Sequence, residues 1–402
     1  MSNRGEVVIL GGARTPHGRF MGALASFSAV ELGIHALKAA LERTGIAQED
    51  VAEVLVGQVV PAGSGQAVAR QIALGAGMPD RTPGLAINKA CGSGLKTVML
   101  AASGIKAGDG DLYVAGGIES MSNAPYLDMT GRAGHRFGDA KLVDALQHDG
   151  LFCHLVGWGM GNAAEFISRE FELTREELDR FAYESHMKAA AATREGKFKA
   201  EIAPVEIKGR KGSVTVVEDD EPIRPDTSLE ALAKLRPAFE ADGIVTAGNA
   251  PGLNDGAAMV VVASRDYAEQ HGHTPIARIV AYGQAAVEPK WLFYAPVKAI
   301  PIVLEKAGWT MDDVDLVELN EAFAAQVLAD LKGLAREGHH LPPEKLNVNG
   351  GAIALGHPVG ASGTRILLTL IHALHDRGLK RGIAALCLGG SEAVALGIEM
   401  LV

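Results

Sequence analysis

The stretch "CGSGLKTVMLAASGIKAGDGDLYVAGGIE" (91–119) has a counterpart in "HPVGASGTRILLTLIHALHDRGLKRGIAALCLGGSE" (357–392), near the other end of the chain. Each begins with a reactive residue and a glycine-rich turn and continues through a helical pattern to a single glycine. An apolar strand then leads to a glycine pair and a glutamate. The same order of turn, helix and strand in two places predicts a duplicated α/β unit.

A second pair of segments points to the same duplication. "TGIAQEDVAEVLVGQ" (44–58) can be laid on "AGWTMDDVDLVELNE" (307–321), with Gly45 six residues before Val51 and Gly308 six residues before Val314. The alternative is that any two α/β segments show this degree of similarity. Because the glycine pairs and the spacing agree together, we predict an α/β fold with two duplicated halves, in which strands alternate with helices and the sheets are mostly parallel.

The middle of the chain differs from both halves, because residues 120–250 are richer in charge. A helix is expected over 175–195 after the capping pattern "LTREEL", and a hairpin within "EIKGRKGSVTVVEDDE" (206–221). "GLNDGAAMVVVAS" (252–264) then returns to the pattern of a buried strand. We expect an N-terminal half in 1–119 and 251–274, an inserted loop domain in 120–250 and a C-terminal half in 275–402.

Composition narrows the class of protein. The chain has 402 residues, 48% of them hydrophobic, and a net charge of −10, which argues against a general nucleic-acid or membrane-surface binder. No apolar run is long enough to span a membrane, and the N-terminus lacks a signal-peptide pattern. Three cysteines do not make a disulfide framework, so we expect a cytoplasmic protein.

Cys91 lies where a strand turns into a helix. The apolar run 85–87 predicts the end of a buried strand, and residues 94–107 have helical spacing. A thiol at a helix start would be stabilised as thiolate, and flanking glycines would let a substrate approach the backbone. The alternative is a buried cysteine that packs as a small hydrophobic residue.

Three more residues are candidates for chemistry. His357, in "NGGAIALGHPVGASG" (349–363), is either a base that accepts a proton from a cysteine or a surface turn residue. Cys387 precedes a glycine pair and is either a thiol base or a core residue. Asn320 ends a strand and either holds a water, donates to an oxyanion or forms a turn. Cys153 lacks a glycine elbow and is expected to be structural, and no histidine has metal-ligand spacing.

Taken together, the chain resembles the thiolase family over its whole length. The matching stretches are "NKACGSGLK", "AGGIESMSNAPY", "AKLRPAF", "TAGN…GLNDGAA", "LNEAFAAQ", "NVNGGAIALGHPVGASG" and "CLGG". The resemblance implies two duplicated α/β halves in alternating helix and sheet layers, with a loop domain carrying the coenzyme A site. It implies reversible acyl transfer between coenzyme A and the alpha carbon of acetyl-CoA, with no metal or cofactor beyond the acyl-CoA substrates.

The resemblance also implies roles for single residues. Cys91 matches the nucleophile that becomes the acyl-thioester, His357 the base that activates it, and Cys387 the second acid/base, which acts on the alpha proton. Asn320 matches the residue that holds a water which, with the histidine, forms one oxyanion hole. The N–H groups of Cys91 and Gly389 would form the other.

For coenzyme A, the resemblance points to Arg224 against the adenine. Pantetheine contacts are implied at Phe239, Ala247 and Phe323, and Met160 and Ala322 are further expected contacts. The cluster Lys208-Arg210-Lys211 is either a solvated hairpin or a phosphate contact. A homotetramer or homodimer is expected from the family alone, with no nucleic-acid or membrane partner.

The sequence departs from the family pattern at four places. Pro251 stands where serine is frequent, Gly159 stands where a histidine is frequent, and "GGSEAV" (389–394) replaces a run of glycines. In "EPKWLFYAP" (288–296), the rings of Trp291, Phe293 and Tyr294 are expected to fill the space that a long acyl tail needs. The alternative is that these rings point into the core or a subunit contact.

These observations predict a short-chain acyl-CoA:acetyl-CoA C-acyltransferase that forms acetoacetyl-CoA and coenzyme A from two acetyl-CoA, working through an acyl-cysteine. One alternative is a broad-chain 3-ketoacyl-CoA thiolase of β-oxidation. Another is a thiolase-fold protein that binds acyl-CoA or lipid without turnover, against which the Cys-His-Cys set argues. A decarboxylating ketoacyl synthase shares the fold but uses two histidines, and only His357 has a fitting loop.

Overall fold

The computed structural model describes residues 5–209 and 212–402. Its main sheet has the order β14-β15-β16-β13-β1-β12-β5-β3-β4, with β2 (Gly18–Arg19) beside β12. The strands of the first half are β1 (Val7–Arg14), β12 (Asn254–Ser264), β5 (Leu112–Ser120), β3 (Glu53–Gly57) and β4 (Gly84–Ile87). The β1–β12 and β12–β5 pairs are antiparallel, and the β5–β3 and β3–β4 pairs are parallel.

The second half repeats this pairing pattern. Its strands are β13 (Ala277–Ala286), β16 (Glu392–Met400), β15 (Arg381–Leu388) and β14 (Leu316–Leu319). The β13–β16 and β16–β15 pairs are antiparallel and the β15–β14 pair is parallel, as in β1, β12, β5 and β3. The strand topology therefore confirms the duplication predicted from the sequence.

The expectation of mostly parallel sheets is wrong. Within the described part of the sheet only β3–β4, β3–β5 and β14–β15 are parallel, and the other ladders are antiparallel. The halves themselves join where β1 runs antiparallel to β13, with Val7 opposite Ile279. A tight turn joins β15 to β16, and such a turn permits only an antiparallel pair.

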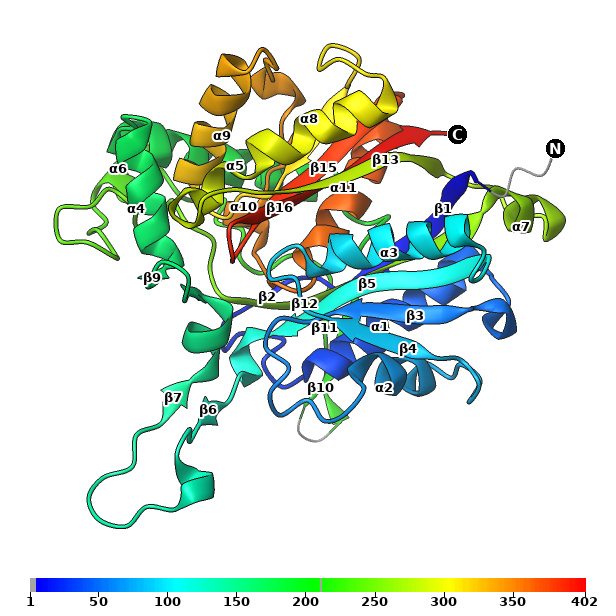
Figure 1. The fold of residues 1–402 in the computed structure, drawn as a ribbon, viewed down its shortest axis with the longest axis horizontal. Coiled ribbons are helices and arrows are strands. Elements are labelled where there is room, and N and C mark those ends of the chain that lie inside the picture. The colour runs from blue at the N-terminus through cyan, green and yellow to red at the C-terminus, as the bar shows by residue number, and fades with distance from the viewer. Residues whose placement is uncertain (1–4, 210–211) are drawn as a thin grey trace.

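Helices and strands form alternating layers, as predicted. Helices α3 (Ser93–Ala107) and α11 (Ser362–Arg377) pack against each other between the strands of the two halves (Figure 1). On the outside, α1 (Ala29–Thr44) and α2 (Val68–Gly75) cover the first half, and α8 (Pro296–Ala307) covers the second. Apolar side chains therefore fill both faces of each half.

The second pair of matched segments also has the same structure in both halves. Gly45 ends α1 with φ 61°, and Gly308 ends α8 with φ 68°, a left-handed conformation that glycine adopts without strain. Val51 and Val314, six residues later, are both buried. The two glycines therefore end their helices at equivalent points in the two halves.

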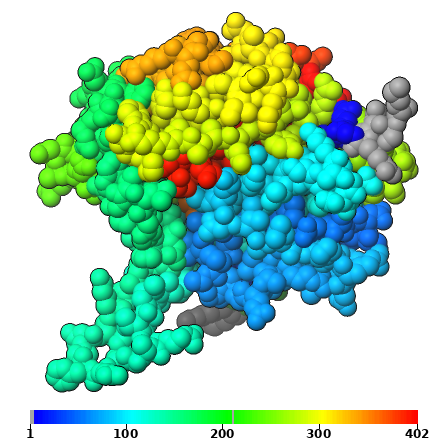
Figure 2. All heavy atoms as spheres, in the orientation of Figure 1, coloured from blue at the N-terminus to red at the C-terminus, as the bar shows by residue number. Residues whose placement is uncertain are grey.

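Residues 121–209 and 212–253 lie outside the main sheet and form helices and short strand pairs. They contain α4 (Met160–Glu170), α5 (Arg175–Arg194), α6 (Leu229–Ala233), and strands β6 (Tyr126–Leu127), β7 (Val143–Asp144), β8 (Phe152–Cys153), β9 (Trp158–Gly159), β10 (Val205–Lys208) and β11 (Val214–Val217). Thr174 and Glu177 form a capping box on α5, which confirms the predicted helix. The β6–β7 arm projects from the body (Figures 1 and 2).

The remaining helices are α7 (Arg265–Gln270), α9 (Ala324–Arg336) and α10 (Ala352–Leu355). Helices α4 and α5 pack on α9, and α5 also packs on α10, so these two helices rest on the second half, whereas Ala203 and Val205 belong to the core of the first half. Within residues 5–209 and 212–402, no helix has both the length and the apolar character needed to cross a membrane.

One strand differs from its expected burial. Residues 85–87 do form the end of a strand, β4, but Leu85 is 42% exposed. The strand is the last in the sheet order and pairs only with β3, so its outer edge and part of its face remain uncovered.

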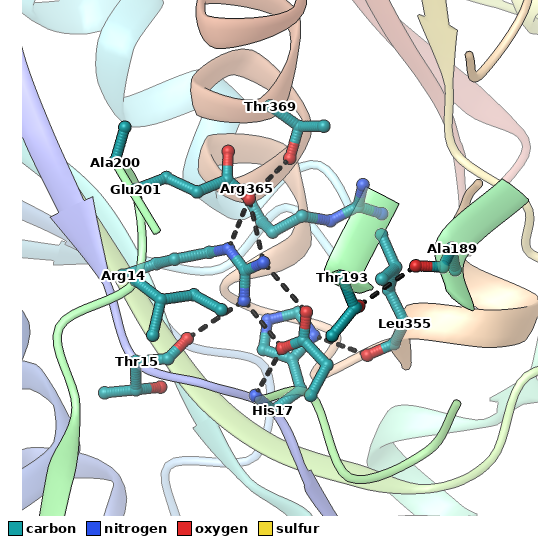
Figure 3. Close-up of polar contacts among 12 residues, drawn as sticks. Arg14, Thr15, His17, Ala189, Thr193, Ala200, Glu201, Leu355, Arg365 and Thr369 are labelled. Carbon is teal, nitrogen blue, oxygen red and sulfur yellow. Dashed lines mark hydrogen bonds and ion pairs between the residues drawn. The ribbon is translucent and has the colours of Figure 1, made fainter. Parts of the chain in front are cut away.

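A buried charge cluster ties the middle segment to both halves (Figure 3). Arg14 on β1 donates to Asp220 at 2.7 and 2.8 Å and to Glu201 at 2.8 Å, and Thr369 on α11 donates to Glu201 at 3.1 Å. Because all of these side chains are buried, each charged group needs its ion-pair and hydrogen-bond partners to offset the free energy lost by leaving water. His17, from the same cluster, contacts the Leu355 carbonyl oxygen through Nδ1 at 3.0 Å, close to the loop that carries His357.

Candidate active site

Three reactive side chains from distant parts of the chain line one pocket of about 380 Å3. Cys91 comes from the first half, and His357 and Cys387 come from the second. The middle segment supplies part of the remaining wall, including Met160 and Phe239. In the space-filling view, residues near the C-terminus (red) emerge where the cyan, yellow and green parts of the chain meet (Figure 2).

A tight turn presents Cys91 at the start of α3. Ala90 has φ 42°, a left-handed conformation that costs a non-glycine residue free energy, of order 1–3 kcal/mol at such sites. The Asn88 side-chain oxygen Oδ1 accepts from the Ala90 N–H at 3.0 Å. Ser93 Oγ accepts from the Lys89 N–H at 2.8 Å and donates to the Ala90 carbonyl at 2.7 Å. These bonds hold the strained turn that the sequence pattern predicted.

The flanking glycines serve packing between the halves. A Cβ on Gly92 would lie 2.3 Å from Leu388 Cδ2, and a Cβ on Gly94 would lie 2.7 Å from Thr364 Oγ1. Close approach of the second half therefore requires both glycines. The expectation that these glycines also let a substrate approach the backbone stays a prediction.

Burial controls the protonation of Cys91. It raises the pKa of the thiol to about 11, although the Gly389 N–H and the cysteine's own N–H both favour the thiolate. The expected stabilisation of the thiolate is therefore outweighed by burial. Reaction of this sulfur as a nucleophile would require a neighbouring base.

His357 is held as a neutral base. Its N–H donates to Asn254 Oδ1 at 2.8 Å, and its Nδ1 lies 2.6 Å from Ser362 Oγ. The Ser362 hydroxyl donates to the Pro358 carbonyl, so it must accept from Nδ1–H, which leaves Nε2 as the proton acceptor. Nε2 is buried with no partner in the described structure, and burial, with the Arg365 charge, lowers the pKa of the ring to about 3.

Ser362 is a residue that the sequence prediction missed as part of the site. Its only sequence signal is a hydroxyl five residues after the histidine, at the start of the expected helix. That spacing could not reveal a bond to Nδ1, because the bond depends on the turn through Pro358 to Ala361.

Cys387, near the end of β15, is 1% exposed and faces the same pocket. Burial raises the pKa of its thiol well above the usual value, and the nearby Cys91 and Asp330 add to this effect. The thiol is therefore protonated in the resting site, and its thiolate would be a strong base.

The turn after Cys387 keeps its shape without a run of glycines. Ser391 takes φ 67°, and its hydroxyl donates to the Pro289 carbonyl at 2.8 Å, while Val287 N–H donates to the Ser391 carbonyl at 2.9 Å. Lys89 and Glu392 form an ion pair across the two segments that carry Cys91 and Gly389. These contacts hold the loop in which "GGSEAV" (389–394) replaces a run of glycines.

Asn320 lies directly after β14, 1% exposed, and is not part of the pocket wall described above. Its N–H donates to the Ala385 carbonyl at 2.9 Å on β15. Neither polar atom of its side chain has a hydrogen-bond partner in residues 5–209 and 212–402, although buried amides normally have one.

Comparison with known proteins agrees with this geometry. The family model of the thiolase N-terminal domain matches residues 7–266, and that of the thiolase C-terminal domain matches residues 273–400. The chain belongs to the thiolase family. It is 50% identical to an acetyl-CoA acetyltransferase of Cupriavidus necator, over 98% of this chain and 99% of the relative. An acetyl-CoA acetyltransferase of Pseudomonas aeruginosa is 48% identical, over 97% and 98%.

Solved structures of thiolase-family relatives have the same fold. The acetyl-CoA acetyltransferase of Bacillus anthracis matches with a TM-score of 0.95 and 43% identity, over 98% of this chain and 99% of that chain. The acetyl-CoA acetyltransferase of Syntrophomonas wolfei matches with a TM-score of 0.96 and 42% identity, with the same coverage. The family and the layered fold predicted from the sequence are confirmed.

The residues expected to bind coenzyme A in this thiolase fall into two adjoining pockets. The pocket with the reactive residues is also lined by Met160, Phe239, Ala322 and Phe323. Arg224 and Ala247 line a neighbouring pocket of about 200 Å3. Lys208 is exposed at the end of β10, and Arg210 and Lys211 lie outside the described residues.

Only one of the three aromatic rings in the thiolase segment 288–296 lines the pocket. Phe293 is 3% exposed and forms part of the wall. Trp291 packs edge-on against Phe166, and Tyr294 packs on Phe171. The expectation that all three rings fill the acyl space is wrong for Trp291 and Tyr294, because they pack between this segment, α4 and α9. Gly159 and Pro251, two other departures, do line the pocket.

Proposed function

We propose that the chain is a cytoplasmic acetyl-CoA C-acetyltransferase, which transfers an acetyl group reversibly between coenzyme A and the alpha carbon of acetyl-CoA. The observation that carries this proposal is the convergence of Cys91, His357 and Cys387 on one pocket. Close relatives named acetyl-CoA acetyltransferase cover nearly the whole chain.

The first step is acylation of Cys91. Its thiol passes a proton to His357 Nε2, and the sulfur attacks the thioester carbonyl carbon of acetyl-CoA. The tetrahedral oxyanion then collapses, coenzyme A leaves as a thiolate, and His357 returns the proton to it. The neutral state of His357 and its Nδ1–H bond to Ser362 both support this role.

The second step makes the new carbon–carbon bond. His357, neutral again, accepts the proton of the Cys387 thiol, and the resulting thiolate removes an alpha proton from a second acetyl-CoA. The carbanion attacks the acetyl carbonyl on Cys91, and acetoacetyl-CoA forms as the Cys91–acyl bond breaks. Cys91 leaves as a thiolate and takes the proton from His357, while Cys387 keeps the alpha proton. While Cys91 is acylated it cannot ionise, so no negative charge at its sulfur opposes a thiolate at Cys387.

Fixed donors must stabilise the oxyanions that develop in both steps. The Gly389 N–H interacts with the Cys91 sulfur, which supports the N–H groups of Cys91 and Gly389 as one donor pair. The unpartnered amide of Asn320 supports a role in holding a water that acts with His357 as the other. Each donor is worth roughly 3 kcal/mol of transition-state stabilisation.

Residues 120–250 are proposed as the loop domain that binds coenzyme A. Met160 and Phe239 from this segment line the pocket together with Ala322 and Phe323, which gives the pantetheine arm an apolar channel. Arg224 and Ala247 lie next along the channel and are proposed to contact the adenine end and the pantetheine. A homotetramer or homodimer is part of the proposal through the family resemblance.

Thiolysis of acetoacetyl-CoA tests the function directly. The wild-type chain should release two acetyl-CoA per substrate, and Cys91→Ser should lose nearly all turnover while Cys153→Ala keeps it, since Cys153 lies in the core. Labelled acetyl-CoA should leave acetyl on Cys91. A wild-type chain that binds acetyl-CoA without turnover would instead be a non-catalytic member of the family.

A further inference from the structure

A second pocket opens beside the reactive one, and it is lined by cationic and neutral side chains only. Its wall includes Arg19, Phe20, His186 and Arg224, and none of the described residues that line it carries a carboxylate. Ala250, Gly252 and Leu253 line both pockets, so the two spaces adjoin. A ligand held by its thiol end near Cys91 would therefore extend into the second pocket.

The backbone of Arg19 is held by hydrogen bonds, and its side chain is available to a ligand. Its N–H donates to Glu221 Oε2 at 2.8 Å, and the next residue, Phe20, donates to the Leu253 carbonyl at 2.9 Å. Glu221 also accepts from the Ala23 N–H at 3.1 Å. Among the described residues, the Arg19 guanidinium has no hydrogen-bond or ion-pair partner, and the side chain is exposed at the pocket wall.

Arg224 adds a second positive charge to this pocket. Its N–H donates to His186 Nδ1 at 3.1 Å. Burial, together with the Arg224 charge, lowers the pKa of His186 to about 4, so the imidazole is neutral at physiological pH and does not add a charge. The chain carries a net charge of −10, so these two guanidinium groups form a local positive site on an acidic protein.

We propose that Arg19 binds the pyrophosphate of coenzyme A. In coenzyme A the pyrophosphate directly follows the pantetheine arm, so it would leave the reactive pocket at Gly252 and Leu253, beside Arg19. Guanidinium groups bind phosphate oxygens through paired N–H donors. Pro251, between the shared wall residues, offers no hydroxyl where family members frequently have serine, and Arg19 supplies a donor nearby. This inference rests on the proposed function.

Binding measurements on the full chain separate the phosphates from the rest of the ligand. Calorimetry with coenzyme A, dephospho-coenzyme A and pantetheine should be run on the wild type, Arg19→Gln and Arg19→Lys. Arg19→Gln should weaken both phosphate-containing ligands about tenfold and leave pantetheine unchanged. Arg19→Lys should recover part of the lost affinity, because lysine keeps the positive charge but not the paired N–H donors of the guanidinium group.

Arg194→Gln is the matched control, because Arg194 is an exposed arginine at the end of α5 that lines neither pocket. It should leave all three affinities unchanged. The Arg19→Gln penalty should also shrink at high salt, as expected for a partly exposed ion contact.

Three results would overturn the assignment. If Arg19→Gln binds pantetheine more weakly by the same factor, the variant distorts the pocket. If its affinity falls for coenzyme A but not for dephospho-coenzyme A, Arg19 contacts the 3′-phosphate. If its affinity falls for none of the three ligands, Arg19 does not contact the ligand. These readouts need no turnover. A chain that binds coenzyme A with the expected Arg19 dependence but does not cleave acetoacetyl-CoA would overturn only the enzymatic proposal.

Discussion

Gly94 and Gly363 occupy matching places in the two copies of the repeat, and each packs against the residue that follows the other. A Cβ on Gly94 would lie 2.7 Å from Thr364 Oγ1, and a Cβ on Gly363 would lie 2.4 Å from the Leu95 backbone nitrogen. The first turns of α3 and α11 therefore touch. Because Cys91 precedes one helix and His357 the other, this contact sets the separation of the proposed nucleophile and base.

Gly363→Ala should destabilise the fold and misplace the catalytic pair. The new methyl group would meet backbone atoms, which cannot rotate away, and overpacking of this kind costs about 1–3 kcal/mol. Urea unfolding should report the lost stability. Gly5→Ala, which adds a methyl group in open space, should change nothing. Equal stability of the two variants would show that the helices separate without cost.

Alkylation of Cys91 by iodoacetamide should accelerate about tenfold per pH unit from pH 6 to pH 10, without a plateau. The thiolate is the reactive form, and a pKa raised to about 11 means that its fraction keeps rising over this range. Mass spectrometry of the Cys91 peptide separates it from Cys153 and Cys387. A rate that is constant between pH 6 and pH 9 would instead indicate a preformed thiolate–imidazolium pair.

Ser362→Ala should lower kcat at least about tenfold with little change in KM. Without the hydroxyl, Nδ1–H loses its acceptor, and the proton can move to Nε2, where the base is needed. Ser168→Ala is a matched control, since Ser168 is also a buried helical serine whose hydroxyl bonds to a carbonyl, that of Ala164. Normal kcat in Ser362→Ala would remove the serine from the positioning of His357.

Cys387→Ala should separate the two half-reactions. Cys91 should still accept acetyl from labelled acetyl-CoA, because His357 activates it without help from the second thiol. Exchange of the methyl protons of acetyl-CoA with solvent should be lost, because no base then faces the alpha carbon. If acylation and exchange fall equally in a folded variant, the proposed division of roles is wrong.

Phe293→Ala should widen the range of acyl chains. The ring is part of the pocket wall, and its removal should raise the relative efficiency for 3-oxooctanoyl-CoA over acetoacetyl-CoA about tenfold. Trp291→Ala is the control, since that ring packs on Phe166 outside the wall. A shift with Trp291→Ala alone would show that a different part of the segment limits the chain length. Equal or better wild-type efficiency with 3-oxooctanoyl- and 3-oxohexadecanoyl-CoA would identify a broad-chain enzyme.

Local sequence determined much of the fold. The glycine-terminated helices and apolar strands of the two copies follow from periodicity and capping, which depend on neighbouring residues, so α3, α5, α11 and β12 could be predicted. Strand direction could not be predicted in this way. Whether β12 runs parallel or antiparallel to β5 depends on how the chain returns from residues 121–253, which no local pattern records.

The same division applies to the site. The sequence alone singled out Cys91, His357 and Cys387 as candidates, because glycine-rich turns around them are local features. Tertiary structure alone decided that burial raises the pKa of Cys91, that Ser362 fixes the ring of His357, and that Phe293 but not Trp291 lines the pocket. Burial, hydrogen-bond partners and side-chain direction arise from segments far apart in the chain, so they exist only once those segments have packed together.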